Sequence, residues 1–346
     1  MYDLKAYLPT TKKELQLRGW DEVDVILFSG DAYIDHPAFG AAVIGRVLEH
    51  AGYKVAIVPQ PDWRGDHRDF TKLGKPRLFF AVTAGSMDSM VNHYTAAKRL
   101  RSDDAYTPEG KAGMRPDYCT ITYCNILKKL YPDVPIVIGG IEASMRRLTH
   151  YDYWSNRLMP SILVDSKADI LVYGMGEKQI VEIAKAIDRC AEDGRSLRLK
   201  MEDRCAEDIP QVAYLTDKLR GERQEAIVLQ SHEEAVKSKR VHAENFRLIE
   251  TESNKINAAT IIQPVGERYV PRVSIPAILS SANSKNNELE WSLTRAESSR
   301  SVNMNSCEDN CLSSSDIASA IEPSAEVMRS ILMFVIVLRF WGVIPA

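Results

Sequence analysis

The stretch that decides the fold is Asp24–Gln60, which reads DVILFSGDAYIDHPAFGAAVIGRVLEHAGYKVAIVPQ. An apolar run at Val25–Phe28 is followed by a loop, by apolar residues at helical spacing from Phe39 onward, and by a second apolar run at Val55–Val58. This order predicts a β-strand, an α-helix and a parallel β-strand. A βαβ unit buries its strands on both faces and binds ligands at their carboxyl ends, so function is expected first in the loop after the first strand.

Three further apolar runs, separated by stretches of helical periodicity, extend this pattern. We expect buried strands at Arg77–Thr83, Val134–Ile141 and Ala168–Tyr173. We expect helices over Met90–Leu100, Asp117–Tyr131 and from Gly176 to about Ala191, with a mobile loop after the first of them. The pattern predicts an α/β fold over residues 1–195, a doubly wound flavodoxin-like parallel sheet whose loops after strands one, four and five share one rim.

The chain changes character twice after this domain. Residues 196–271 combine short apolar runs at Val212–Leu215, Ala226–Leu229 and Ala259–Gln263 with a charged helical stretch at Glu233–Ile249, which predicts a small α+β extension and linker. Residues 272–346 are rich in serine, and their apolar residues follow neither period until the final run. Such a composition is nearer to that of disordered chains than to that of a packed domain.

Composition excludes few classes of protein. The formal charge of −3 and the pI near 6.2 favour no nucleic-acid partner. Met1–Thr10 lacks the apolar core of a signal peptide, and Ile331–Val343 contains Arg339 and falls short of the about 20 residues that span a bilayer. The six cysteines are irregularly spaced, which indicates reduced thiols. These features favour a cytoplasmic protein without a membrane partner.

Three strings carry a family resemblance: LPTTKKELQLRGWDEVDVILFSGDAYIDHPAFGAAVIGRVLEHAGYKVAIVPQPDW, PIVIGGIEASMRRLTHYDYW and ILVYGMGE. In this order they closely resemble the amino-terminal domain of the YgiQ-type radical SAM proteins, over roughly Met1–Val270. GGIEA and the strand ending in YGMGE are also similar to the cobalamin-binding-type Rossmann domains that precede other radical SAM barrels. Both resemblances imply the fold predicted above.

The resemblance implies a radical SAM barrel after this domain. In the family, three cysteines spaced C-x3-C-x2-C hold a 4Fe-4S cluster, whose open iron binds S-adenosylmethionine and cleaves it reductively. The present chain has Cys307 and Cys311 at the first spacing but Ser314 at the third position. Neither the cluster nor S-adenosylmethionine is therefore expected on this chain, and the missing barrel is the expected docking partner.

The resemblance ends near Pro271, where the composition also changes. One hypothesis that explains both observations is a shift of the coding frame near residue 271, which makes residues 272–346 an out-of-frame tail. The alternative is a family member with a divergent tail.

Asp31, Asp35 and His36 follow the first strand and are candidates for contacts with a ligand at the rim. One class of cobalamin-binding domains carries D-x-H-x-x-G, with the histidine as cobalt ligand. Here Asp35 directly precedes His36, and Gly40 lies one residue too far along the chain, so cobalamin is not expected. The alternative is that Asp31 and His36 bond the loop and cap the helix that begins near Phe39.

A second set of candidates lies at the ends of the fourth and fifth strands: Gly139, Gly140, Glu142, Gly174, Gly176 and Glu177. They could border the same crevice, although glycines at strand ends equally serve turn geometry. The last three do not complete a phosphate-binding G-x-G-x-x-G, because Gln179 stands at its final position. A nicotinamide dehydrogenase is therefore not favoured.

The densest polar and aromatic cluster comprises Arg146, Arg147, His150, Tyr151, Tyr153 and Trp154. It could recognise an anionic substrate or face the missing barrel, and the alternative is an aromatic loop folded over the sheet edge. Cys119 and Cys124 lie five residues apart on a predicted helix and are expected to be buried thiols.

Together these patterns predict the amino-terminal accessory domain of a radical SAM protein, cut short of its catalytic centre. Two alternatives stay open. One is a stand-alone module that binds an unknown small molecule at the rim formed by Asp31, Gly140 and Gly176, and the other is an inactive truncated product. The substrate of the family is not predicted.

Overall fold

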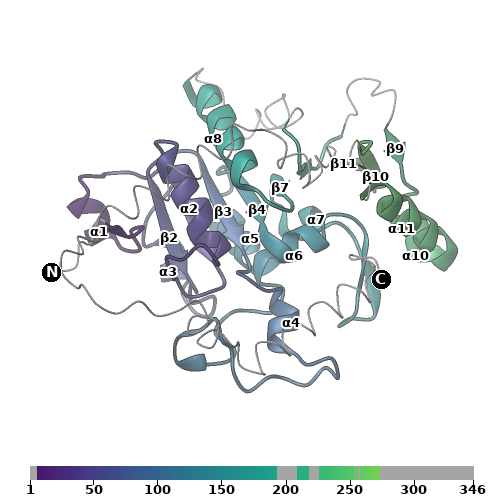
Figure 1. Cartoon of the computed structure of the whole chain (residues 1–346), viewed down its shortest axis with the longest axis horizontal. Coiled ribbons are helices and arrows are strands. Elements are labelled where there is room, and N and C mark those ends of the chain that lie inside the picture. The colour runs from purple at the N-terminus through teal and green to yellow at the C-terminus, as the bar shows by residue number, and fades with distance from the viewer. Residues whose placement is uncertain (1–5, 193–208, 218–225, 254, 256–257, 273–346) are drawn as a thin grey trace, which may run out of the picture. The chain divides into compact units, whose positions relative to one another are not determined.

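A computed structural model describes residues 6–192, 209–217, 226–253, 255 and 258–272. Among these residues, nine strands form one sheet in the order β2-β1-β3-β4-β7-β8-β11-β10-β9 (Figure 1). The first five strands in this order pair in parallel. They are β2 (Val55–Pro59), β1 (Val25–Ser29), β3 (Phe79–Thr83), β4 (Ile136–Gly139) and β7 (Ile170–Val172). The predicted α/β fold with a mostly parallel central sheet is confirmed.

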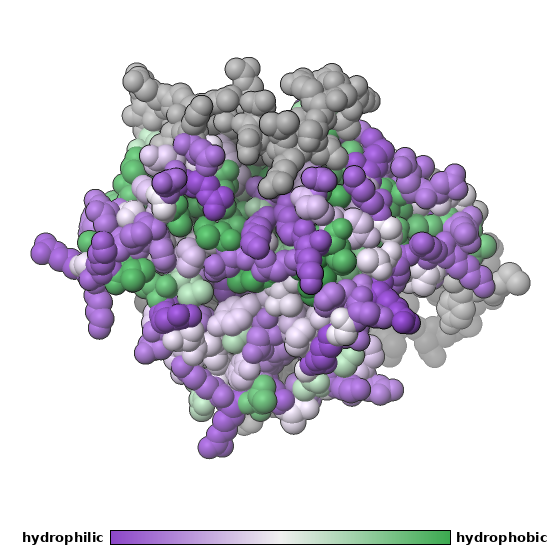
Figure 2. Space-filling model, turned by 180° about the vertical axis from the view of Figure 1, so that it is seen from behind, coloured by the Kyte–Doolittle hydropathy of each residue, from purple (hydrophilic) through white to green (hydrophobic). Residues whose placement is uncertain are grey.

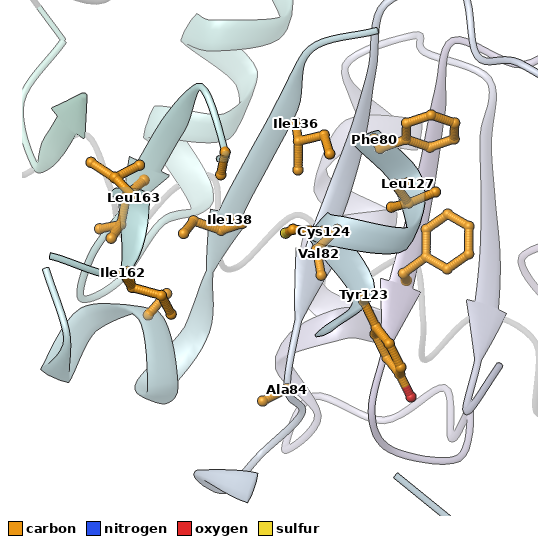
Figure 3. Close-up of a cluster of buried hydrophobic side chains, with 14 of the residues drawn as sticks. Phe80, Val82, Ala84, Tyr123, Cys124, Leu127, Ile136, Ile138, Ile162 and Leu163 are labelled. Carbon is orange, nitrogen blue, oxygen red and sulfur yellow. The ribbon is translucent and has the colours of Figure 1, made fainter. Parts of the chain in front are cut away.

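Alternate residues of each strand face opposite sides of the sheet, and both sides are buried. Val25 and Leu27 belong to one buried cluster, which takes in side chains of α2 (Gly40–His50) and α8 (Glu177–Glu192). Ile26 belongs to a second cluster, together with side chains of α5 (Cys119–Leu130) and α7 (Ile162–Ser166). Figure 3 shows this second cluster, in which Tyr123, Cys124 and Leu127 of α5 lie against β3 and β4. Burial on both faces explains why these strands are apolar throughout.

The elements after residue 208 continue the same sheet. β8 (Val212–Tyr214) pairs antiparallel with β7, and it is followed in the sheet by β11 (Arg268–Arg272), β10 (Ile261–Val265) and β9 (Ile227–Val228). The predicted charged helix is divided into α10 (His232–Lys237) and α11 (Lys239–Ser253), because Ser238 adopts an extended conformation. The predicted domain boundary at residue 195 therefore separates two parts of one continuous sheet.

Short elements complete this unit. A capping box of Thr11 and Glu14, in the spacing S/T-x-x-E, begins α1 (Lys12–Leu17). α3 (Arg68–Thr71) lies between β2 and β3, and a 3₁₀ turn at Pro108–Gly110 lies in the segment predicted as a mobile loop.

The predicted helix over Met90–Leu100 is wrong in its length. The helix α4 covers only Ser89–His93, because Tyr94 is extended and Lys98 adopts a left-handed backbone conformation with φ of 59°. Tyr94 pairs with Leu100 in an isolated antiparallel bridge, so the chain turns back on itself. After β4 the structure adds elements that the sequence pattern did not predict, α6 (Gly140–Met145) and a hairpin of β5 (His150–Asp152) and β6 (Arg157–Met159).

The face of the molecule opposite to that of Figure 1 is largely polar. From the side opposite to Figure 1, hydrophobic residues lie in small groups between hydrophilic ones (Figure 2). Within the described residues, no helix has the length and hydropathy needed to cross a bilayer. Cys307, Cys311 and the tail for which a frame shift was hypothesised lie outside the described residues.

Candidate functional site at the carboxyl edge of the sheet

The strand order singles out one point of the sheet. The chain runs from β1 to β2 on one side and from β3 to β4 on the other, so the connections after the neighbouring strands β1 and β3 leave in opposite directions. In open α/β sheets a ligand binds beside such a point, outside the carboxyl ends of the strands. Asp31 follows β1 there, and Gly85 and Ser86 follow β3.

Asp31 is buried at this point and joins the ends of the two strands. Its Oδ2 accepts a hydrogen bond from the backbone N–H of Ser86 at 2.6 Å. Gly85 has φ of 109°, and a Cβ built there would stand 2.1 Å from Oδ1 of Asp31. Burial raises the pKa of the Asp31 carboxyl, and the positive charge of Arg115 partly offsets this rise.

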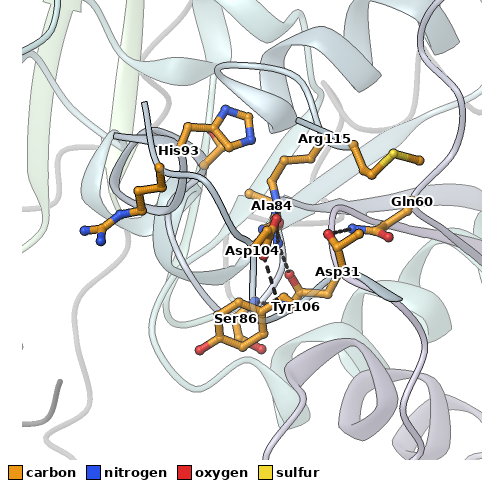
Figure 4. Close-up of polar contacts among 12 residues, drawn as sticks. Asp31, Gln60, Ala84, Ser86, His93, Asp104, Tyr106 and Arg115 are labelled. Atoms are coloured by element: carbon orange, nitrogen blue, oxygen red, sulfur yellow. Dashed lines mark hydrogen bonds and ion pairs between the residues drawn. The ribbon is translucent and has the colours of Figure 1, made fainter. Parts of the chain in front are cut away.

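Arg115 lies between the ends of β1 and β3, where it contacts Asp31 and the carbonyl group of Ala84. Its side chain is fully buried, with Nη2 at 2.9 Å from Oδ1 of Asp31 and at 3.1 Å from Oδ2 of Asp104. Its Nη1 donates to the carbonyl of Ala84, directly after β3, at 3.0 Å. Figure 4 shows the guanidinium directed at all three groups. One cation thus holds two buried carboxylates and a strand end.

The rest of the segment between α4 and α5 is anchored at the same edge. The carbonyl of Tyr106 accepts the backbone N–H of Ala32, and Gln60 donates to the hydroxyl of Thr107 at 2.6 Å. These hydrogen bonds hold the segment predicted as a mobile loop to the edge of the sheet. The cavity beside Asp31 measures only about 10 Å³, which is too small for anything larger than one water molecule.

Glu142 lies in α6, directly after β4, at the same edge of the sheet, but it binds the ends of two helices rather than Arg115. One carboxylate oxygen accepts the backbone N–H of Ser89, the first residue of α4, at 2.9 Å. The other oxygen accepts the backbone N–H of Thr120, in the first turn of α5, at 2.9 Å. Glu142 is buried, so a single carboxylate satisfies the amino ends of two helices.

Arg146 is paired within the chain rather than available to an anionic ligand. It is buried and forms an ion pair with Asp88, which also caps α4 by accepting the backbone N–H groups of Met90 and Val91. Burial lowers the pKa of His150 to about 4, so this imidazole is neutral at physiological pH. These two members of the predicted cluster therefore offer little positive charge to a substrate.

The candidate glycines lie together at the ends of β4 and β7. Gly140 has φ of 86°, and a Cβ there would stand 2.5 Å from Oγ1 of Thr83. The hydroxyl of Ser144 donates to the carbonyl of Gly140 and accepts the N–H of Gly174. A Cβ at Gly176 would stand 2.8 Å from Cγ1 of Val172. Close packing of the chain itself thus accounts for glycine at positions 140 and 176.

The remaining predicted residues are spread along the rim. Gly139 ends β4, and Glu177 begins α8. His36 is exposed and accepts the N–H of Ala38 at its Nδ1, while Asp35 pairs with Arg46. The structure gives α2 no side-chain cap, so neither Asp31 nor His36 caps it as the alternative interpretation expected.

A larger hollow lies beside this loop rather than over the strand ends. It has a volume of about 420 Å³ and is lined by Tyr7, Leu8, Thr10, Glu14, Tyr33, Ile34 and Asp35. Its carboxylates are engaged, because Glu14 belongs to the capping box and Asp35 pairs with Arg46.

The described residues do not fit an iron–sulfur cluster. No group of three histidine, cysteine or acidic side chains there is arranged to hold a metal ion. Cys119 and Cys124 are buried against apolar side chains, and burial raises the pKa of both thiols well above the ordinary value. Iron–sulfur clusters are bound by thiolates, which these environments disfavour.

We expect Cys119 and Cys124 to resist alkylation in the native protein. Iodoacetamide at neutral pH should label the part-exposed Cys190, whereas the two buried thiols should react only after denaturation, because the thiolate is the reacting species. Peptide mass spectrometry of native and denatured samples measures this difference. Labelling of Cys119 as fast as Cys190 in the native state would contradict it.

We expect Gly85→Ala to lower the free energy of unfolding by about 2–3 kcal/mol, from backbone strain together with displacement of the Asp31 carboxyl. Gly74→Ala is the matched control, since Gly74 has φ of 83° but no atom within 4 Å of a built Cβ. The control should lose about 1–2 kcal/mol in urea unfolding, from backbone strain alone. Equal losses in the two variants would show that the Asp31 contact does not matter.

Sequence reasoning did not find Arg115, Asp104 or Asp88. Asp104 and Arg115 carry opposite charges and lie in one segment without helical or strand periodicity. Their proximity in the sequence is a weak signal for the ion pair that they form. Arg146 was noticed, but its partner Asp88 lies 58 residues away in the chain.

The parallel sheet and the Arg115 cluster at its edge define an α/β domain whose strand ends are closed by its own side chains. The chain belongs to the Radical SAM N-terminal family, whose model matches residues 7–298. The resemblance to the YgiQ-type radical SAM proteins is thereby confirmed. The matched region extends beyond residue 271, where the resemblance was predicted to end.

Three curated relatives show how much of a longer protein is matched. A UPF0313 protein of Bacteroides thetaiotaomicron is 60% identical over 272 residues, covering 78% of this chain and 44% of the relative. A UPF0313 protein of Porphyromonas gingivalis is 56% identical, covering 78% and 41%, and one of Clostridium perfringens is 50% identical, covering 76% and 38%. The chain therefore spans less than half the length of these relatives.

Among solved structures, the radical S-adenosylmethionine methyltransferase TsrM from Kitasatospora setae, with tryptophan substrate and a SAM analog bound, has some similarity. The match has a TM-score of 0.34 and 19% identity, and it covers 57% of this chain and 29% of that protein.

Proposed function

We propose that this chain is the amino-terminal scaffold of a radical SAM protein, and that the chemistry belongs to the part of the full-length relatives outside the matched region. In those relatives we propose a 4Fe-4S cluster that binds S-adenosylmethionine and cleaves it reductively. A cytoplasmic location is part of the same proposal. The observation that supports a scaffold is the buried Arg115, which occupies the crevice where a domain of this kind would bind a ligand.

The scaffold proposal includes a finer statement about the fold. The parallel strands occur in the order β2-β1-β3-β4-β7, which is the order 2-1-3-4-5 of flavodoxin-like sheets, and helices cover both faces. This order supports a doubly wound flavodoxin-like classification. We further propose that cobalamin is not a ligand of this chain, because Asp35 is bound to Arg46 instead of supporting His36.

A direct test compares cleavage of S-adenosylmethionine by two proteins, the full-length Bacteroides relative and this chain. Each is treated with iron, sulfide and a strong reductant under anaerobic conditions, and 5′-deoxyadenosine is quantified by mass spectrometry. We expect the nucleoside from the relative and none above background from this chain. Production by this chain at a comparable rate would overturn the proposal.

The hollow of about 420 Å³ favours a second candidate, a stand-alone small-molecule-binding module. Its location beside Tyr33 differs from the predicted rim at Asp31, Gly140 and Gly176. Native mass spectrometry of the purified chain distinguishes the two candidates. If the purified chain retains a small molecule that the Tyr33→Ala variant lacks, the binding module is favoured. If the chain and the variant both have the mass of the protein alone, the scaffold is favoured.

A further inference from the structure

Two segments far apart in the chain present a group of exposed apolar side chains at the carboxyl edge. Val91 of α4 is 40% exposed, and Leu100, in the turn after α4, is 72% exposed. Tyr151 of β5 and Tyr153 of the following turn are 40% and 43% exposed. We call these four residues the α4–hairpin surface. Exposed apolar side chains that gather on one part of a folded protein mark interaction sites.

Direct contacts join the turn after α4 to the β5–β6 hairpin, so the two parts of the α4–hairpin surface belong to one structure. The hydroxyl of Tyr153 donates to the carbonyl of Ala96 at 2.8 Å, and Nζ of Lys98 donates to the carbonyl of Trp154 at 3.2 Å. The rings of Tyr94 and Trp154 lie 5.2 Å apart between their centroids, and Nζ of Lys98 lies 4.6 Å from the ring centroid of Tyr153. The turn and the hairpin therefore form one unit.

This unit is anchored to the domain by two consecutive residues that precede α5. Asp117 holds the turn, because it contacts Nδ1 of His93 at 2.7 Å and accepts the hydroxyl of Tyr94 at 2.8 Å. Tyr118 holds the hairpin, because its hydroxyl donates to Asp152 at 2.8 Å. The backbone that carries the α4–hairpin surface is thus held in place before a partner binds, which lowers the entropic cost of binding.

The chemistry of the surface indicates the kind of partner. Lys98, Arg99 and Arg101 are exposed and lie beside Leu100 in the chain, so the turn that carries this leucine is basic. Aromatic residues and arginine are enriched in protein interfaces. A complementary partner would offer an apolar pocket with acidic residues at its border.

We propose that the α4–hairpin surface docks the remaining part of the full-length relatives, the region outside the 44% that this chain matches in the Bacteroides protein. The inference rests on the proposed function, because it takes the catalytic region as the partner. It adds the place of contact and the complementary chemistry.

Hydroxyl-radical footprinting tests the proposal on two proteins. One is the full chain, and the other is a fusion of residues 1–272 to the unmatched remainder of the Bacteroides relative. We expect labelling of Leu100, Tyr151 and Tyr153 to fall several-fold in the fusion. Phe246 on α11, which is 46% exposed, is the internal control and should be labelled equally in both proteins.

Leu100→Glu in the fusion should restore the labelling of Tyr153, whereas Val228→Glu, at a position 57% exposed on β9, should not. Equal labelling of the surface in chain and fusion would overturn the proposal. So would protection in the chain alone that grows with protein concentration, because it would identify a second copy as the occupant.

Cluster content and cleavage of S-adenosylmethionine by the full-length relative are measured separately. A relative without a cluster refutes the proposed function, and an active relative combined with an unprotected surface in the fusion refutes only the docking proposal.

Discussion

Arg115→Met is expected to lower the free energy of unfolding by about 3–5 kcal/mol, because it leaves the buried carboxylates of Asp31 and Asp104 without their cation. Methionine keeps most of the volume of the arginine stem, so lost charge rather than a cavity dominates the effect. Urea denaturation at neutral pH measures the change. Arg68→Met, which removes an exposed ion pair with Asp66, should change stability by less than about 1 kcal/mol.

The pH dependence of this loss gives a second test. In the native protein, burial already raises the pKa of Asp31, so the folded state takes up a proton more readily than the unfolded chain. The contribution of Asp31 to the free energy of unfolding therefore falls as the pH rises from the ordinary aspartate pKa to the higher pKa of Asp31 in the folded state. Without Arg115 the pKa should rise further, so the variant should lose less stability in mildly acid solution than at neutral pH.

A variant that also carries Asp31→Asn and Asp104→Asn distinguishes charge from packing. Removing both carboxylates should recover part of the stability that Arg115→Met loses, because no unpaired buried charge remains. The ion cluster would be contradicted if Arg115→Met lowered the free energy of unfolding equally at mildly acid and neutral pH, and if the two asparagine substitutions did not reduce that loss.

Glu142→Leu is the second change expected to have a large effect. It removes the acceptor for the backbone N–H groups of Ser89 and Thr120, each bound at 2.9 Å. Hydrogen bonds to a charged group contribute about 1.5–3 kcal/mol each, so the loss of two should lower the free energy of unfolding by about 3–6 kcal/mol. Glu142→Gln keeps one amide oxygen and should lose roughly half as much.

Hydrogen exchange shows where the loss of Glu142 acts. The amides of Ser89 and Thr120 should exchange faster in Glu142→Gln, while amides in the middle of β1 stay protected. Glu182→Leu, at an exposed position of α8, is the control and should change stability by less than about 0.5 kcal/mol. Unchanged exchange at both amides would rule out the double helix cap.

The strands could be predicted because they are buried on both faces. Val25–Phe28 and Val55–Val58 are continuous apolar runs, and the helix between them has a clear helical period. The capping box before α1 was likewise readable, since its two residues lie three apart and act locally. Interactions of short range or regular period were thus accessible from the sequence.

The candidate site was less accessible because its interactions are long-range. Glu142 was noticed, but its partners are backbone groups 53 and 22 residues away, which no side-chain pattern reveals. The helix predicted over Met90–Leu100 fails because tertiary contacts of Lys98 with Tyr153 and Trp154 accompany a left-handed turn that local propensity does not favour.

The central claim is that this chain is a scaffold whose chemistry lies in the rest of the full-length relatives. Its most direct test is the iron and acid-labile sulfide content, measured on this chain and on the full-length Bacteroides relative after identical anaerobic reconstitution. The account predicts about four iron and four sulfide ions per relative, with a broad visible absorption band, and none retained by this chain after desalting. A stoichiometric cluster on this chain, or a relative that retains none, would contradict it.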